Sequence, residues 1–346
     1  GDIVAFKDYA NTFDTNNVTI TPNGSDKIGG IAANSVLSTE SQSVTLIFID
    51  STRGWLDVHD STSNVEGAQF IAATGGNTVA TCGNFRIHTF TGPGTFCVSA
   101  AGNAAGPGKG GGGGGAGGFR EGLGLNDSYT GSPLRASTGV PVTVTGFPIT
   151  VGGGGAIRTQ GGSSVFSTIT SAGGGSNPGN CAAGTDGGSG GGAGKGTHSG
   201  GSGNTPATNP PQGNPGSDNP GNPGETSPLV GTGGGGAGNA GSGVTSNTRG
   251  GRGGVGVASS ITGSSVKYAG GGGGGGGGIN PVTAAGCVPA LCRTAQFGAG
   301  SGGITAGGQG GSGTANTGGG AGGGGNNGDA GGTGGSGVVI IRYKFQ

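Results

Sequence analysis

The chain has 346 residues and no net formal charge, and its 98 glycines make about 28% of the sequence, against roughly 7% in average proteins. Charged residues make only 9%, with fifteen basic side chains balancing fifteen acidic ones. No basic field is available for nucleic acid, and no apolar run of about 18 residues predicts membrane insertion. The sequence lacks methionine and opens in a strand-like run, which indicates a processed or truncated product.

Residues 1–65 are predicted to form a small β module for attachment or oligomerisation. Turn sequences separate its strand-like runs, including Pro22-Asn23-Gly24 and the Ser51 to Gly54 stretch before Trp55. Trp55 is predicted to fill the small core of this module. The predicted strands cover residues 3–6, 18–21 and 44–49.

Residues 66–105 are predicted to be a connection followed by a β-hairpin. Two alternating runs, 84–90 and 95–98, flank the four-residue turn Thr91-Gly92-Pro93-Gly94. Such a Gly/Pro turn between alternating runs is typical of a hairpin.

Residues 106–337 hold 86 of the glycines and only six aromatic side chains, so a conventional hydrophobic core cannot order them. The alternatives are a disordered linker and a lattice held by backbone hydrogen bonds. Only 15 charged residues lie in this region, and small residues separate the glycines, which favours the lattice. We expect extended helices with three residues per turn, and the broken glycine register excludes collagen.

Residues 338–346 contain no glycine and begin with Val338-Val339-Ile340-Ile341, which predicts a closing strand paired with the 85–98 region. The predicted fold class is therefore all-β. It consists of a small β module and a strand-framed glycine-rich domain, with almost no α-helix.

Three sequence features resemble the glycine-rich domain of bacteriophage tail-fibre and tail-tip adhesin proteins. They are the run from Phe85 to Phe96, the strand-to-glycine step at 149–155, and the closing Gly334 to Tyr343 stretch. The resemblance covers roughly residues 75–345. It implies packed polyglycine II helices with receptor-binding loops at one end. The N-terminal module is similar to β modules of phage fibres, and this similarity implies a homotrimer.

The function expected from this resemblance is that of a virion structural protein in a tail fibre or other exterior appendage. Its N-terminal module would bind other virion proteins, and its loops would bind a host receptor, either a glycan or an outer-membrane protein. Two alternatives stay open. One is a purely structural capsid decoration or fibre protein, and the other is a secreted ice-binding or cell-wall protein.

Receptor contacts are expected where side chains interrupt the glycines, in residues 123–135, 204–229 and 280–297. Aromatic and Arg side chains are the usual energetic anchors of interfaces. The candidates are Tyr129, Arg135, Arg293 and Phe297. An equally weighted alternative is that these stretches only connect glycine helices.

No motif supports an enzyme, a cofactor or a metal site. The stretch 189–197 resembles a phosphate-binding loop, but Ser189 and Gly196 stand where that motif needs Gly and a hydroxyl residue. His88 lies on one face of the predicted hairpin, and a structural role is favoured for it. The five cysteines form no C-x-x-C pair, so free thiols are favoured over a bridge between Cys82 and Cys97 or Cys287 and Cys292.

Overall fold

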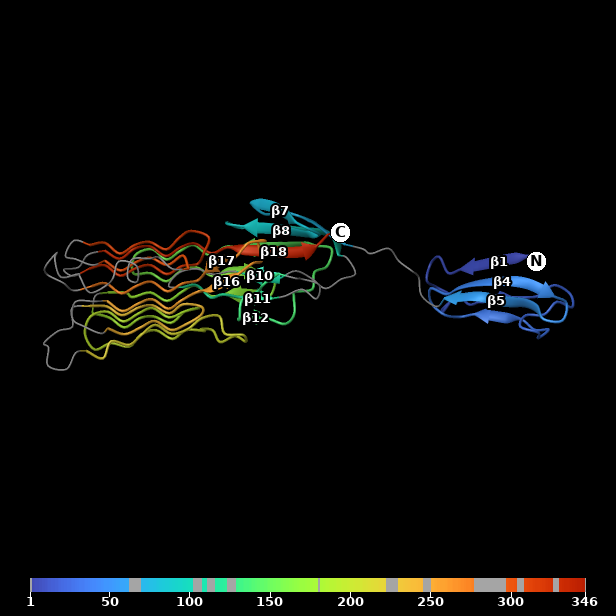
Figure 1. The fold of residues 1–346 in the computed structure, drawn as a ribbon, viewed down its shortest axis with the longest axis horizontal. Helices are drawn as coiled ribbons and strands as arrows, with labels where there is room; N and C mark the ends of the chain where they lie inside the picture. Colours follow the sequence, from blue (N-terminus) through green and yellow to red (C-terminus); the bar gives the residue numbers. More distant parts are fainter. Residues whose placement is uncertain are drawn as a thin grey trace. The chain divides into compact units, whose positions relative to one another are not determined.

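The computed structural model describes residues 2–61, 70–101, 108–110, 116–122, 129–179, 181–221, 230–244, 250–276, 297–303, 308–325 and 330–345. The chain divides into two compact units, Gly1–Ala68 and Gln69–Gln346. Strands are the regular elements of both units, and no helix occurs among the described residues (Figure 1). This confirms the predicted all-β class. No helix of the described part is long and apolar enough to cross a bilayer.

The first unit contains a three-stranded antiparallel sheet and a two-stranded one. Val44 and Leu46 alternate along the central strand and bury their side chains beside Leu37, with Trp55 packed against this cluster as predicted. The sheet order β1-β4-β5 is formed by β1 (Ile3–Lys7), β4 (Ser43–Asp50) and β5 (Gly54–Ser61), and the second sheet pairs β2 (Val18–Ile20) with β3 (Ser35–Leu37).

Asp8 fixes the turn that follows β1. Its buried carboxylate accepts hydrogen bonds from the amides of Thr12, Phe13 and Ser41, each 3.0 Å long. Burial alone would raise the pKa of Asp8, but these hydrogen bonds outweigh it and lower the pKa below its usual value. The ionised carboxylate therefore ties the β1 turn to the residues just before β4.

The second unit begins with a frame of two sheets, which stand at one end of the glycine segments (Figure 1). The four-stranded sheet has the order β10-β18-β8-β7, formed by β10 (Gly108–Gly110), β18 (Val339–Lys344), β8 (Phe85–Phe90) and β7 (Thr78–Cys82). The five-stranded sheet has the order β15-β14-β13-β9-β6, formed by β15 (Ile169–Ser171), β14 (Ser164–Phe166), β13 (Gly146–Thr150), β9 (Gly94–Ala101) and β6 (Ile71–Thr74).

The predicted hairpin of residues 84–98 is wrong, although both of its strands exist. β8 pairs with β7 and β18, whereas β9 pairs with β6 and β13, so the turn after Phe90 carries the chain from one sheet to the other. Phe90 and Phe96 are both buried in the cluster between the sheets. The strands cover each other's faces instead of sharing an edge, because that arrangement buries both aromatic rings.

The closing strand β18 is buried on both of its faces. Val339, Ile341 and Tyr343 join the cluster between the two sheets, whereas Val338 and Ile340 join a second cluster on the opposite face. Successive side chains of a strand point to opposite faces, so one glycine-free run serves two cores. The pairing of β18 with β8 confirms the predicted role of this strand in the frame.

Two short strand pairs complete the described strands. They are the parallel pair β11 (Glu121–Gly122) with β12 (Arg135–Ala136) and the antiparallel pair β16 (Val257–Ser259) with β17 (Val266–Tyr268). The second pair, β16 with β17, contributes Val257 and Tyr268 to the second cluster, together with Phe119 and Tyr129. The buried Glu121 carboxylate accepts hydrogen bonds from the Ser132 amide and the Ser259 hydroxyl. Burial and the charge of Glu121 raise the pKa of Tyr268 to about 12.

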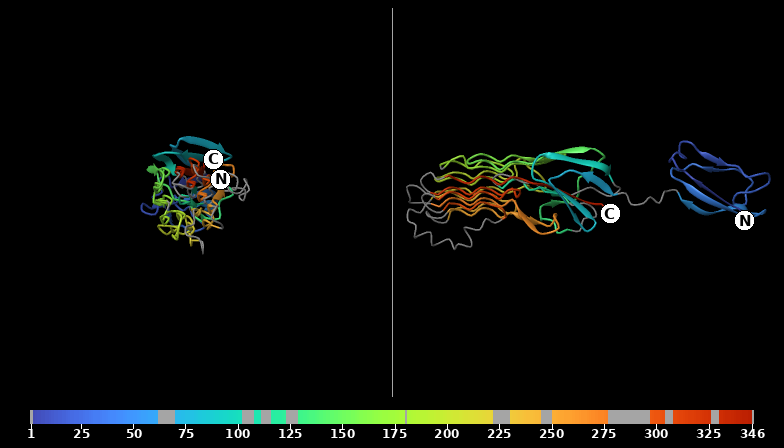
Figure 2. Two further views of the ribbon diagram at one scale, coloured as in Figure 1. Left: turned by 90° about the vertical axis from the view of Figure 1, so that its left-hand side faces the viewer. Right: turned by 90° about the horizontal axis from the view of Figure 1, so that it is seen from above.

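Extended segments leave the frame and return to it repeatedly, and we call them the glycine bundle (Figures 1 and 2). Their backbone hydrogen bonds repeat every three residues, as residues 231–237 illustrate. The amides of residues 231, 234 and 237 donate to one neighbouring segment, at the carbonyls of 275, 272 and 269. The amides of 232 and 235 donate to a second segment, at 193 and 190. The amides of 233 and 236 donate to a third segment, at 242 and 239. This is the expected three-residue turn of polyglycine II geometry.

Residues 231–237 also accept hydrogen bonds from two further segments, at residues 251–254 and 214–217. One segment is therefore bonded to neighbours on several sides, which a β-strand in a flat sheet cannot achieve. The distance between neighbouring segments leaves no room for side chains, because a Cβ at Gly233 would lie 1.8 Å from the Arg252 carbonyl oxygen. Glycine is required at such positions because backbone approaches backbone.

Candidate functional site

Tyr129, the first predicted contact residue, lies in the core. Its side chain is only 9% exposed and belongs to the cluster below β18. The guanidinium of Arg342 lies 5.4 Å from its ring centre. The residue supports the frame and does not project from a loop.

Arg135 and Phe297 lie near the frame. Arg135 is exposed in β12, opposite Glu121 in the strand register. Phe297 is half-buried with φ of 58°, and the Lys267 ammonium of β17 lies 5.0 Å from its ring centre. Arg293 lies outside the described residues, so the four predicted residues are not brought together in one described site.

The predicted Pro/Asn-rich stretch 204–229 does not form a single loop. Asn204 orders its first part, because its side-chain oxygen accepts hydrogen bonds from Thr208 and from the Gln212 amide. Residues 214–219 then run within the glycine bundle, where the Asn219 side chain donates to the carbonyls of Gly194 and Val230. Residues 222–229 fall outside the described part.

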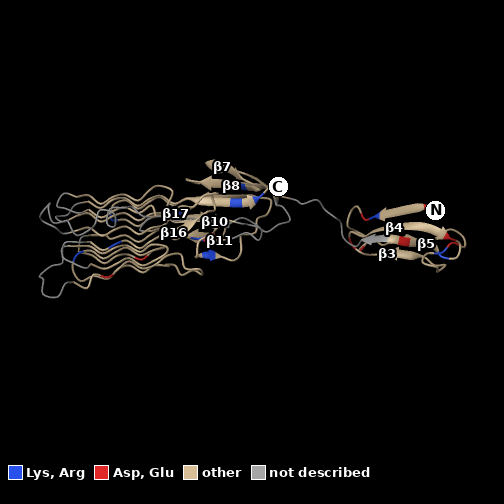
Figure 3. Cartoon of the chain, in the orientation of Figure 1, with Lys and Arg blue, Asp and Glu red and all other residues tan. Residues whose placement is uncertain are grey.

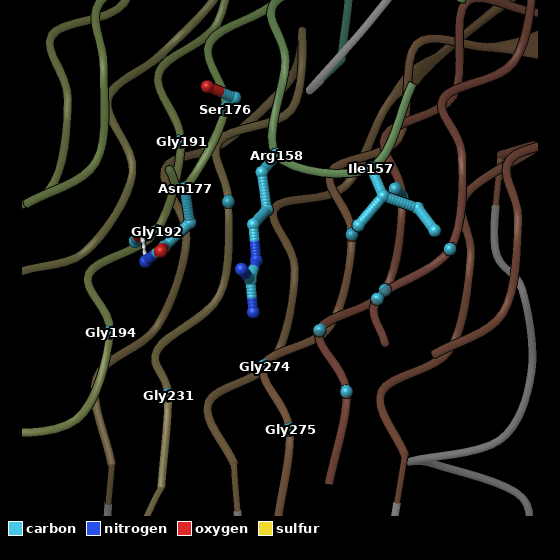
Figure 4. Close-up of a pocket in the computed structure, with 18 of the residues that line it drawn as sticks. Ile157, Arg158, Ser176, Asn177, Gly191, Gly192, Gly194, Gly231, Gly274 and Gly275 are labelled. Carbon is cyan, nitrogen blue, oxygen red and sulfur yellow. Dashed lines mark hydrogen bonds between the residues drawn. The ribbon is translucent and has the colours of Figure 1, made fainter. Parts of the chain in front are cut away.

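A cavity lies at the end of the bundle away from the frame, which we call the far end. The chain leaves β13 at Thr150, turns at residues 156–160 and returns to β14 at Ser164. This turn bounds a cavity of about 180 Å³ whose walls are mostly glycine backbone (Figure 4). The lining residues with the larger side chains include Ile157, Arg158, Asn177 and Lys195.

The turn at 156–160 is closed by hydrogen bonds from the Thr159 amide and hydroxyl to the Ala156 carbonyl. It holds Arg158 at φ of 66°, and the Arg158 side chain points into the space between the glycine segments (Figure 4). Across the cavity the Asn177 amide donates to the Gly192 carbonyl at 2.9 Å. Polar backbone thus dominates the described lining, and two basic residues, Arg158 and Lys195, belong to it.

Charge is sparse over the rest of the bundle (Figure 3). Asp186 and Asp218 use their carboxylates within the bundle, where they accept hydrogen bonds from the Ser202 and Gly200 amides. Neither lines the cavity. Arg158 and Lys195 therefore give the cavity a local positive charge in a chain with no net charge.

His88 is a structural residue of the frame. Its Nδ1 lies 2.6 Å from the Gly75 carbonyl oxygen and its Nε2 lies 3.0 Å from the Tyr343 hydroxyl. A carbonyl only accepts, so Nδ1 carries the proton and Nε2 accepts from Tyr343 when the ring is neutral. Burial lowers the pKa of His88, and the charge of Arg86 lowers it further, against the opposite effect of the Gly75 hydrogen bond.

The described cysteines are free thiols, and Cys97 and Cys181 are exposed. Cys82, Cys97 and Cys181 are free, so the Cys82–Cys97 bridge considered from the sequence does not form. Cys287 and Cys292 lie outside the described residues. Within the described ranges no three His, Cys, Asp or Glu side chains gather as a metal site requires.

Sequence reasoning missed Arg158 and Ile157. The available signal was the five-residue interruption Ala156-Ile157-Arg158-Thr159-Gln160 between the glycine runs 152–155 and 161–162. Lys195 was considered only as part of a failed phosphate-loop motif. A short interruption is a weaker sequence signal than a Pro-rich stretch, although both place side chains at the ends of glycine segments.

Comparison with known proteins supports the glycine-rich architecture. The sequence profile of a glycine-rich domain matches residues 80–344, which cover the glycine bundle and most of the frame, except β6 and the start of β7. No curated protein and no solved structure matches the chain. By its sequence over most of its length, the chain belongs to the glycine-rich domain family.

Proposed function

We propose that the chain is a virion structural protein, a tail-fibre or tail-tip adhesin that presents a host-contacting surface at the far end of the glycine bundle. The observation that carries the proposal is the separation of the two ends of the second unit. One end is closed by the β frame, and the other carries turns with side chains around a cavity. A bonded glycine lattice between them is a rigid spacer that needs few side chains of its own.

The first unit is proposed to bind other virion proteins. It exposes several apolar side chains, including Ile3, Ile31 and Ile49, each more than half accessible. Exposed apolar groups of this kind are compatible with a protein partner. The homotrimer implied by the fibre-like resemblance would use the same unit.

The experiment is localisation followed by competition. Antibody-labelled particles should carry the chain on the tail appendage, and the purified chain should reduce adsorption of particles to host cells. Label on the capsid without competition would favour a capsid decoration role. Absence from particles, with secretion from cells, would favour the ice-binding or cell-wall alternative.

Side-chain substitutions should locate the contact within the chain. Arg158→Gln is expected to weaken competition, because it alters the far end without touching either core cluster. Arg135→Gln changes an exposed cation near the frame and serves as the matched control. If only the Arg135 variant lost competition, the contact surface would lie at the frame.

A further inference from the structure

The cavity at the far end is bordered by backbone amides that have no described partner. In residues 269–276, one row of amides donates to residues 297–303 and a second row donates to residues 251–254. The third row begins at Ala269, whose amide donates to the Thr317 carbonyl, but no described residue accepts a hydrogen bond from its next two members, Gly272 and Gly275, and both of these line the cavity. Amides three residues apart point the same way in this geometry.

The same pattern recurs on two other walls. Described acceptors are missing for the amides of Ala321 and Gly324 on one wall and of Gly192 and Lys195 on another, and all four residues line the cavity. A backbone amide away from a partner is costly unless an outside acceptor satisfies it. Three rows of donors around one space therefore favour an acceptor-rich occupant.

Arg158 provides an independent observation. It adopts a left-handed φ of 66° in a chain with 98 glycines, although glycine would take this conformation without strain. Strained backbone is retained where the surroundings or the function require the side chain. Here the side chain enters the cavity, and no described residue forms an ion pair with it (Figure 4).

Charge identifies the class of occupant. Arg158 and Lys195 are the charged residues in the described lining, and no acidic residue accompanies them. Amide donors together with a guanidinium suit a carboxylate or phosphate, which Arg can bind through two parallel hydrogen bonds. Ile157, which is 43% exposed, adds an apolar surface at the rim.

We propose that this cavity binds the anionic group of an acidic saccharide, through Arg158, Lys195 and the lining amides that have no described acceptor. A volume of about 180 Å³ suits one terminal sugar unit, since whole drug-sized ligands occupy about 300–1,000 Å³. The assignment of the anionic group to a saccharide rests on the proposed host-contacting function. The binding of a carboxylate or phosphate does not.

Calorimetric titration of the full chain with galacturonate, inorganic phosphate and neutral galactose tests the site. Binding of at least one anion, and not of galactose, is expected. Arg158→Gln should weaken that binding at least tenfold. Arg252→Gln, an exposed Arg of the bundle outside the lining, should leave it unchanged. Binding of galacturonate alone would identify the natural group as a carboxylate, and binding of phosphate alone would identify it as a phosphate.

Arg158→Gly separates binding from folding. Glycine relieves the left-handed backbone, so the melting temperature should not fall, while anion binding should be lost. Equal affinity in the wild type, Arg158→Gln and Lys195→Gln would overturn the site, as would galactose binding as tight as that of the anions. If the site binds anions but the purified chain does not compete for host cells, the proposed function fails and the anion site stands.

Discussion

At the residue scale, some glycines of the bundle are required because another backbone segment lies where a Cβ would stand, and others have free space there. A Cβ at Gly253 would lie 1.8 Å from the Gly271 carbonyl oxygen, with more backbone within 3 Å. Gly253→Ala must separate two bonded segments, so we expect a loss of unfolding free energy of about 1–3 kcal/mol or more. Chemical denaturation monitored by circular dichroism measures this loss.

The matched control is Gly153→Ala. Gly153 is exposed, and a Cβ built on it meets nothing within 4 Å. The substitution should be neutral or stabilise by up to about 1 kcal/mol, since alanine restricts the unfolded chain. Equal losses in the two variants would show that close backbone approach does not decide which glycines are required.

His88 gives the frame a pH dependence. Because burial lowers the folded-state pKa of His88, the unfolded chain takes up this proton first as the pH falls below about 6.5. The stabilising contribution is complete above that pH and is lost as the pH falls toward the folded pKa. The melting temperature of the second unit should therefore decrease between pH 7.5 and pH 5.

The variant His88→Gln removes the titrating group and keeps a side-chain donor for Gly75. It should be less stable at pH 7.5, because the buried contact with Tyr343 changes, but its melting temperature should depend less on pH over the same range. An unchanged pH slope in this variant would assign the dependence to other groups.

At the element scale, β18 joins the two core clusters of the second unit. Ile341 is fully buried between the sheets, so Ile341→Ala should cost about 2–5 kcal/mol of unfolding free energy. Val79→Ala, on the half-exposed edge strand β7, should change stability by no more than about 0.5 kcal/mol.

Deletion of residues 338–346 removes the side chains that β18 contributes to both clusters and should abolish soluble folding. Melting of the deletion variant at the wild-type temperature would rule out this role.

The strands themselves were more predictable than their partners. Alternation and β-branched composition located β1, β4, β8 and β18, because these patterns are local. Pairing depends on which faces bury which rings, and the turn after Phe90 serves a sheet-to-sheet crossing as well as a hairpin. Local turn chemistry could not distinguish the two arrangements.

At the scale of the whole molecule, glycine content predicted the three-residue geometry but not which segments are neighbours. Glycine side chains carry no information that would select residues 190–193 over any other segment as the partner of 231–237. The same lack of information hides the candidate site. Arg158 and Lys195 are 37 positions apart by subtraction of their numbers, and only the folded lattice brings them to one cavity. Tyr129 was predicted to contact a receptor because it is an aromatic interruption of the glycine sequence, but its side chain is buried in a core cluster.

The two units of the chain should unfold separately. Each has its own buried clusters: Leu37, Val44 and Leu46 in the first unit, and the two larger clusters around β18 in the second. Small units bury a smaller fraction of their surface and are less stable. Calorimetry should therefore record two transitions, with Gly1–Ala68 unfolding at the lower temperature.

A chain beginning at Gln69 supplies the control for this assignment. It should lose the lower transition and retain the upper one within a few degrees, because both of its clusters are intact. The lower transition of the full chain should also move down below about pH 4, where protonation of Asp8 removes its charge and weakens its hydrogen bonds from three backbone amides. Asp8→Asn should weaken that acid sensitivity and leave the upper transition unchanged. A single transition in the full chain, lost as a whole on truncation, would mean that the first unit is required to fold the second.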